Sequence, residues 1–220
     1  MPDRRTVNLP NVITVARIAA APLLVILALS GAWQLRALAF VIFVAAAVTD
    51  YVDGMLARSR NLVTDVGRLL DPLADKLLLI GTFVPMLVRF PALPFVTPVG
   101  PVGLPAWVFV VVIGRELFMT LFRQAAARRG VVIGAIGAAK WKTGLQWTWV
   151  GTAFFWFAAA GAAAQYGWGA LPVWHDAALF IGTVGLVTMT GAVALTLYSL
   201  GLYLRRYGGV LTRRADHHRG

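Results

Sequence analysis

The sequence predicts an all-α integral membrane protein, and three features of the chain indicate it. Hydrophobic residues make up 59% of the 220 residues, charged residues make up only 13%, and the mean hydropathy is +0.75. Soluble domains carry about a quarter charged residues. The apolar residues form long stretches, and about 20 such residues cross a bilayer as a helix. Cysteine is absent, which excludes a disulfide framework and a thiolate metal site.

Six apolar stretches of spanning length follow one another along the chain. The segment 91–105 holds five prolines and two glycines, a composition that breaks helices and predicts a loop outside the membrane. We expect a single membrane domain over residues 1–210, followed by a basic tail over residues 211–220. The expected spans are residues 10–33, 37–58, 67–88, 104–127, 142–163 and 177–204.

The first span has the basic, then apolar, order of a secretory signal peptide. Arg4 and Arg5 precede it, and small residues follow near residue 30. However, Arg17 interrupts the apolar region, and the stretch is long enough to cross a membrane. We therefore expect a retained first span.

The other spans differ in where they carry charge. The second is uncharged until Asp50, and the third is apolar only after Lys76. The fourth contains Arg115, Glu116 and Arg123, whereas the sixth is uncharged throughout. The fifth follows a basic segment. Ionisable residues at membrane depth are costly, so those within the spans are candidates for function.

The net charge of +11 follows a topological pattern that does not require a nucleic-acid partner. One set of loops carries most of the Lys and Arg residues, whereas the opposite loops carry only Arg36 and Arg89. Because cytoplasmic loops are enriched in Lys and Arg, both termini are expected in the cytoplasm, with an even number of spans. The basic residues assigned to the cytoplasmic side are Arg4, Arg5, Arg58, Arg60, Arg128, Arg129, Lys140, Arg205, Arg206, Arg213, Arg214 and Arg219.

Four aspartates form the main candidate site. Asp50 and Asp53 are three residues apart, and Asp71 and Asp75 are four apart, so each pair shares one helix face. The short connection between the two spans predicts antiparallel helices whose carboxylates face each other near the cytoplasmic surface. Four carboxylates repel one another unless cations intervene, and oxygen ligands suit Mg²⁺ or Mn²⁺. A pair of such ions commonly promotes attack at phosphorus.

Smaller and basic residues around the aspartates fit a phosphate ligand. Gly54, Ala57 and Gly67 let a bulky ligand approach the backbone, and Arg58 can neutralise a phosphate. The alternative is that the polar and small residues only pack helices together and that Arg58 is a topological flank. Pro72 leaves two options for the third helix, which either begins at Asp71 or continues through Pro72.

The aspartate pattern resembles the signature of the CDP-alcohol phosphotransferase family. All eight signature positions match at the family's spacing: Asp50, Asp53, Gly54, Ala57, Arg58, Gly67, Asp71 and Asp75. The resemblance implies a transferase that moves a phosphatidyl group from CDP-diacylglycerol to an alcohol and releases CMP. It also implies a multi-pass protein of the plasma or inner membrane, and a homodimer for which the sequence identifies no interface.

The resemblance also assigns roles to individual residues. Asp50, Asp53, Asp71 and Asp75 would bind two metal ions, Mg²⁺ or Mn²⁺, and Asp75 would also act as the base that deprotonates the acceptor. The residues implied at the CDP-diacylglycerol site are Asn11, Thr14, Gly54, Ala57, Arg58, Thr64 and Gly67.

Segments of the second half resemble bacterial phosphatidylglycerophosphate synthases, a branch of this family, and imply sn-glycerol 3-phosphate as the acceptor. The segments begin at Gly114, Leu121 and Lys140. Arg123, Lys140 and Lys142 lie near the cytoplasmic ends of spans and are expected to bind the acceptor phosphate. For Arg115 and Glu116, a buried structural pair and a substrate contact remain open.

Two alternatives remain open. The same chemistry could use inositol phosphate or phosphatidylglycerol as the acceptor. A cation channel or carrier would also place acids in the membrane, although a conduction path requires acids across its depth, and here they cluster on one side.

Overall fold

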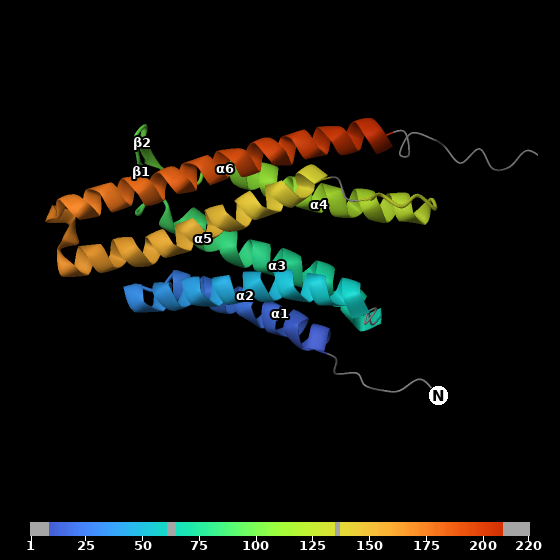
Figure 1. The fold of residues 1–220 in the computed structure, drawn as a ribbon, viewed down its shortest axis with the longest axis horizontal. Coiled ribbons are helices and arrows are strands. Elements are labelled where there is room, and N and C mark those ends of the chain that lie inside the picture. Colours follow the sequence, from blue (N-terminus) through green and yellow to red (C-terminus); the bar gives the residue numbers. More distant parts are fainter. Residues whose placement is uncertain (1–8, 61–64, 135–136, 209–220) are drawn as a thin grey trace, which may run out of the picture. The chain divides into compact units, whose positions relative to one another are not determined.

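The computed structural model describes residues 9–60, 65–134 and 137–208, and the side chains of residues 14–50, 73–134 and 141–208. Within these residues the fold is mostly helical (Figure 1). The six α-helices are α1 (Leu9–Ala28), α2 (Trp33–Arg60), α3 (Asp65–Arg89), α4 (Ala106–Arg128), α5 (Gly137–Tyr166) and α6 (Pro172–Tyr207). The shorter elements are β1 (Phe95–Thr97), β2 (Gly100–Val102) and the 3₁₀ helix η1 (Trp168–Ala170).

The predicted six-helix order is confirmed, since each expected span overlaps one observed helix. The third helix begins before Asp71 and continues through Pro72, which settles the question that the sequence left open. A proline inside a helix removes one backbone hydrogen bond and does not necessarily end the helix. The helix α1 likewise contains Pro22 in its interior.

The loop expected at residues 91–105 contains a β-hairpin that the sequence did not predict. Phe95 pairs with Val102, and Thr97 pairs with Gly100. Gly100 has a φ of +106°, a backbone conformation that glycine adopts without a steric penalty. The hairpin packs closely on α6, since a Cβ added to Gly182 would lie 1.9 Å from the carbonyl oxygen of Val96.

The chain divides into two compact units, each built from two separate stretches. Unit 1 comprises Met1–Gly103 and Val150–Gly185, and unit 2 comprises Leu104–Trp149 and Leu186–Gly220. In unit 1, α1 packs against both α2 and α3, and the three helices lie side by side (Figure 1). In unit 2, a buried cluster of Met119, Phe122 and Tyr203 joins α4 to the second half of α6.

Two basic residues expected in loops instead donate hydrogen bonds to backbone carbonyl oxygens of unit 1. Arg36 lies in the first turn of α2 and is only 7% exposed. Its guanidinium donates to the carbonyl oxygens of Gly31 at 2.8 Å and Phe157 at 2.9 Å. Arg89, the last residue of α3, donates to the carbonyl oxygens of Ala28, Leu29 and Ser30. The last carbonyls of a helix have no partner within it, and Arg89 supplies a donor to that of Ala28, the last residue of α1.

The helix α5 extends beyond both ends of the expected fifth span, residues 142–163, and Arg36 packs against it. Gly161 lies inside α5. A Cβ at Gly161 would lie 2.8 Å from a guanidinium nitrogen of Arg36. The glycine is therefore needed for close approach of Arg36 and does not mark a helix end.

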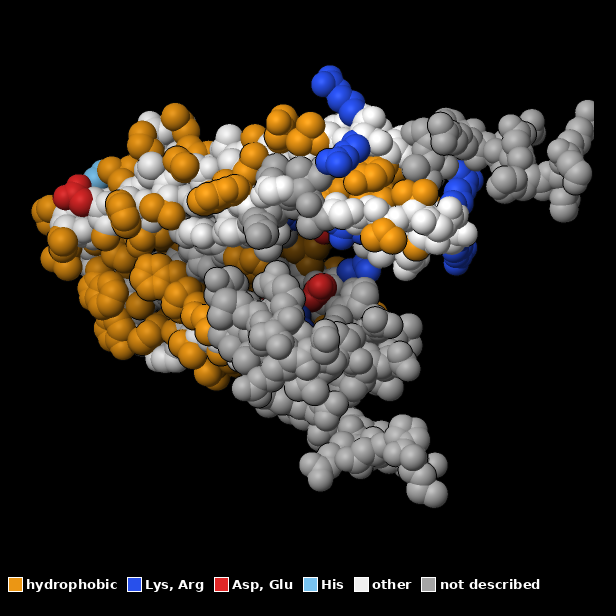
Figure 2. All heavy atoms as spheres, turned by 45° about the vertical axis from the view of Figure 1, so that its right-hand side comes forward, with side chains coloured by type: hydrophobic (Ala, Val, Ile, Leu, Met, Phe, Trp, Pro, Cys, Tyr) orange, Lys and Arg blue, Asp and Glu red, His pale blue; other side chains and the backbone are white. Residues whose placement is uncertain are grey.

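Among the residues whose side chains the structure describes, two helices are long and apolar enough to cross a membrane, namely residues Trp33–Asp50 of α2 and Pro172–Tyr207 of α6. Large apolar side chains are also exposed on other helices, as at Ile26 (69%) and Val110 (64%). Figure 2 shows such side chains over much of the described surface. Extensive exposed apolar surface marks a membrane or protein interface.

Candidate functional site

The best-defined charged cluster of unit 1 joins three helices through Arg17. This residue lies on α1, Asp50 lies on α2, and Asp75 lies on α3. The Nη1 atom of Arg17 donates to Oδ1 of Asp50 and, at 2.9 Å, to Oδ1 of Asp75. The predicted approach of carboxylates from the second and third helices is thus observed for this pair, with a cation between them.

The three side chains differ sharply in exposure. The side chain of Arg17 is 6% exposed, whereas those of Asp50 and Asp75 are 39% and 66% exposed. The cationic group is therefore fixed within the helix packing, and the carboxylates remain accessible from outside. Thr14, one turn before Arg17, is 1% exposed.

Close packing of α1 on α3 holds Arg17 near Asp75. A Cβ at Gly81 would lie 2.7 Å from the carbonyl oxygen of Ala21 and 3.0 Å from its Cα. Gly81 therefore lets the two backbones approach closely. Ala21 lies one turn after Arg17, so this contact sets how far Arg17 stands from α3.

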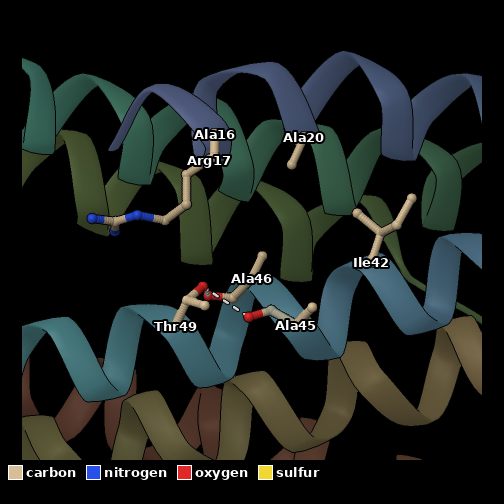
Figure 3. A pocket seen from close by; sticks show the side chains of 7 residues that line it. All are labelled: Ala16, Arg17, Ala20, Ile42, Ala45, Ala46 and Thr49. Atoms are coloured by element: carbon tan, nitrogen blue, oxygen red, sulfur yellow. Dashed lines mark hydrogen bonds between the residues drawn. The ribbon is translucent and has the colours of Figure 1, made fainter. Parts of the chain in front are cut away.

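An apolar groove lies between α1 and α2 beside the same arginine (Figure 3). Its volume is about 250 Å³. The hydroxyl of Thr49 donates to the carbonyl oxygens of Ala45 and Ala46, so it presents no free donor to the groove. In Figure 3 the guanidinium of Arg17 points away from the apolar part. The lining residues are Ala16, Arg17, Ala20, Ile42, Ala45, Ala46 and Thr49.

A second charged cluster lies in unit 2 around Glu116. Arg115 of α4 donates to Oε1 of Glu116 at 2.9 Å, and Nζ of Lys142 on α5 donates to the same oxygen. Arg115 also donates to the hydroxyl of Ser199 on α6 at 3.2 Å. The side chains of Arg115 and Lys142 are 7% and 6% exposed. Two buried cations thus share one carboxylate, which leaves an excess of positive charge.

The expected acceptor residues take different partners. Lys142 belongs to the Glu116 cluster, whereas Arg123 donates to the hydroxyl of Tyr203 at 3.3 Å and lies 5.7 Å from the centroid of that ring. The ion pair between Arg115 and Glu116 is present in the structure, and binding of a substrate by either residue stays a prediction.

Several predicted site residues lie outside the described side chains. Of the four aspartates, the structure therefore describes the contacts of Asp50 and Asp75 alone. The residues outside this range are Asn11, Asp53, Gly54, Ala57, Arg58, Thr64, Gly67, Asp71 and Lys140.

The donor set of the described pair fits a divalent cation. Two carboxylate oxygens from different helices converge on one positive nitrogen, and Mg²⁺ or Mn²⁺ binds such hard oxygen ligands. Among the described side chains, no group of three or more His, Cys, Asp or Glu residues gathers elsewhere for a metal.

Comparison with known proteins decides the family. The family model described as CDP-alcohol phosphatidyltransferase matches residues 7–202. The chain belongs to this family. The match covers both the Arg17 cluster and the Glu116 cluster, so both lie within the part of the chain that is typical of a CDP-alcohol phosphatidyltransferase.

Individual relatives in the family carry two kinds of name. A "CDP-diacylglycerol--glycerol-3-phosphate 3-phosphatidyltransferase" of Bacillus subtilis is 38% identical over 63% of this chain and 72% of its own length. A protein of Arabidopsis thaliana named "CDP-diacylglycerol--glycerol-3-phosphate 3-phosphatidyltransferase 2" is 37% identical over 64% of this chain and 62% of its own length. A "Cardiolipin synthase (CMP-forming)" of Oryza sativa is 39% identical over 67% of this chain and 45% of its own length. The chain thus spans less than two thirds of both plant relatives.

Within this CDP-alcohol phosphatidyltransferase, the site residue that sequence reasoning missed is Arg17. Its signal was present, because it is a lone cation in an apolar span, and such residues have a partner in the membrane. From the sequence, Arg17 served only as an argument against a signal peptide, and no partner was predicted for it. Ser199 was also missed, and a serine in an uncharged span carries no comparable signal.

Proposed function

We propose that this chain transfers a phosphatidyl group from CDP-diacylglycerol to sn-glycerol 3-phosphate, which yields phosphatidylglycerophosphate and CMP. The observation that carries the proposal is the Asp50–Arg17–Asp75 cluster beside an apolar groove. A donor with a hydrocarbon part and a charged diphosphate requires both surfaces next to each other. The names of the relatives support the acceptor.

Asp50, Asp53, Asp71 and Asp75 would hold the metal, two Mg²⁺ or Mn²⁺ ions. Bound divalent ions supply charge that polarises phosphoryl oxygens and stabilises the leaving phosphate. The carboxylates of Asp50 and Asp75 are accessible enough to take up ions from solution.

Asp75 is the proposed base. An alcohol is a poor nucleophile until its proton is removed. Asp75 accepts the proton of the acceptor hydroxyl, whose oxygen forms a bond to the phosphorus that carries diacylglycerol. The bond from that phosphorus to CMP then breaks. The side chain is 66% exposed, so an acceptor can reach it.

The donor site would combine the cytidine-binding residues with the groove. The hydrocarbon part of the donor is proposed to lie against the small apolar side chains between α1 and α2. The residues proposed for the CDP part are Asn11, Thr14, Gly54, Ala57, Arg58, Thr64 and Gly67.

The acceptor phosphate is proposed to bind the basic residues of unit 2, Arg123, Lys140 and Lys142. The excess positive charge around Glu116 supports this assignment, because cationic donors form strong charge-assisted hydrogen bonds with a phosphate. Arg115 contributes to this positive charge, and we include it among the residues proposed for the acceptor phosphate.

We also propose six membrane spans, with both termini and the active site at the cytoplasmic side of a plasma or inner membrane. The alternation of basic loops supports this topology. Residues 1–210 would form the membrane domain, and residues 211–220 would lie as a basic tail on anionic lipid. A homodimer is the expected assembly of the family.

Phosphatidylglycerol is the second candidate acceptor, because a relative named cardiolipin synthase has an identity similar to that of the others. Inositol phosphate needs a phosphate site of the same kind as glycerol 3-phosphate does. A channel or carrier is disfavoured, since the family match covers residues 7–202.

The test is CMP release by the purified full chain in detergent, with CDP-diacylglycerol and Mg²⁺ or Mn²⁺. Glycerol 3-phosphate, inositol phosphate and phosphatidylglycerol are supplied in parallel reactions. We expect CMP with glycerol 3-phosphate, and no CMP in excess EDTA. Release with phosphatidylglycerol alone would replace the acceptor, and no release with any acceptor would overturn the proposed activity.

A further inference from the structure

We propose that Arg17 is a built-in counter-ion that competes with the divalent metal for Asp50 and Asp75. It would stabilise the metal-free protein and lower the affinity of the site for metal. This inference rests on the proposed function only in taking Asp50 and Asp75 as metal ligands.

The contacts of Arg17 place its charge where the two carboxylates converge. One nitrogen, Nη1, donates to Oδ1 of both aspartates. Two carboxylates held this close repel each other without a cation. In the metal-free protein the guanidinium therefore supplies the positive charge that brings α2 and α3 together at this point.

Burial makes Arg17 an effective competitor. Its side chain is 6% exposed, so water has little access to the guanidinium. Hydration therefore compensates little for the loss of its ion pairs. The neighbouring groove is apolar and offers the displaced charge no carboxylate among its lining residues. A metal ion that takes both Oδ1 atoms must weaken these ion pairs, and that cost is subtracted from its binding free energy.

The chain offers a matched control in Arg36. It is also a buried arginine of unit 1, at 7% exposed, but the acceptors of its hydrogen bonds are the carbonyl oxygens of Gly31 and Phe157. Loss of Arg36 should lower stability without changing the affinity for metal.

The experiment uses the full chain in detergent micelles, freed of metal with EDTA, as wild type, Arg17→Gln and Arg36→Gln. Mn²⁺ binding is measured from the electron paramagnetic resonance signal of the free ion, and thermal unfolding is followed with and without Mn²⁺. We expect Arg17→Gln to bind Mn²⁺ about five- to tenfold more tightly than the wild type. Its melting temperature should fall in EDTA and recover with excess Mn²⁺, whereas that of Arg36→Gln should fall equally in both.

Folded Arg17→Gln protein that binds Mn²⁺ no more tightly than the wild type would overturn the proposal. If Arg17→Gln does not fold, Arg17→Lys replaces it. Its ammonium lacks the planar fork of arginine, so we expect tighter Mn²⁺ binding there too, and unchanged or weaker binding would overturn the proposal. Failure of the wild type and every variant to bind Mn²⁺ would instead overturn the proposed metal site.

Discussion

Arg17 on α1 donates from Nη1 to Oδ1 of Asp75 on α3 at 2.9 Å, across 58 positions of the chain. The same nitrogen also contacts Asp50 on α2. The first helix is therefore part of the acidic cluster. The positive charge of Arg17 explains how two accessible carboxylates stay close together. Replacement of Arg17 removes the partner of both, and the effect can be measured.

Replacement of Asp75 by Asn should abolish turnover while the protein still folds. The amide cannot accept the acceptor proton, and general-base catalysis contributes about 10²–10⁴-fold to a rate. The measurement is CMP release from CDP-diacylglycerol with glycerol 3-phosphate, together with binding of the donor. Asp176→Asn, an exposed aspartate at the start of α6, serves as the control and should retain its activity. Near-normal release by Asp75→Asn would contradict the role of Asp75 as base.

Replacement of Lys142 by Met should weaken binding of the acceptor without weakening binding of the donor. Glu116 keeps its ion pair with Arg115, so the fold should persist, but one buried positive charge is lost. We expect the KM for glycerol 3-phosphate to rise about tenfold or more, the effect of one charge-assisted hydrogen bond.

The KM for CDP-diacylglycerol should stay unchanged in the same variant. Arg128→Met removes an exposed charge at the last residue of α4 and should change neither constant. An equal rise in both KM values for Lys142→Met would indicate a general structural defect and argue against the acceptor role.

Replacement of Gly81 by Ala should destabilise the packing of α1 on α3. The new Cβ would lie 2.7 Å from the carbonyl oxygen of Ala21, so the helices must separate. Overpacking of this kind costs about 1–3 kcal/mol. The free energy of unfolding in detergent measures the loss. Gly201→Ala is the control, because a Cβ there would meet no described atom within 4 Å, and it should not lower stability.

Replacement of Arg89 by Met should destabilise the end of α1. The variant keeps much of the apolar stem of the side chain but loses the donors to Ala28, Leu29 and Ser30. Hydrogen bonds from a charged group contribute about 1.5–3 kcal/mol each, so we expect a loss of at least about 2 kcal/mol in unfolding free energy. Arg205→Met, on an exposed position of α6, should have little effect. Equal stability of the two variants would show that these carbonyls do not depend on Arg89.

The helical architecture was predictable because it depends on local patterns. A long apolar stretch forms a helix wherever it lies in a membrane, since its backbone groups can satisfy one another. The spacing of Asp50, Asp53, Asp71 and Asp75 likewise belongs to two neighbouring stretches, and it was enough to indicate the family. The hairpin at residues 95–102 was not predictable, because Pro98 and Pro101 read as loop signals and each strand has only three residues.

By itself, the sequence determined the helical class of the fold and the family, and it marked the residues that are proposed for the site. Only the tertiary structure decided which charges meet. It placed Arg17 between Asp50 and Asp75, and it paired both Lys142 and Arg115 with Glu116. It also showed that Arg89 donates to the carbonyl oxygen at the end of α1, whereas Arg36 donates to Gly31 and to Phe157 of α5. The physical reason is that periodicity fixes the face of a helix on which a charge lies, whereas its partner depends on which helices pack against that face.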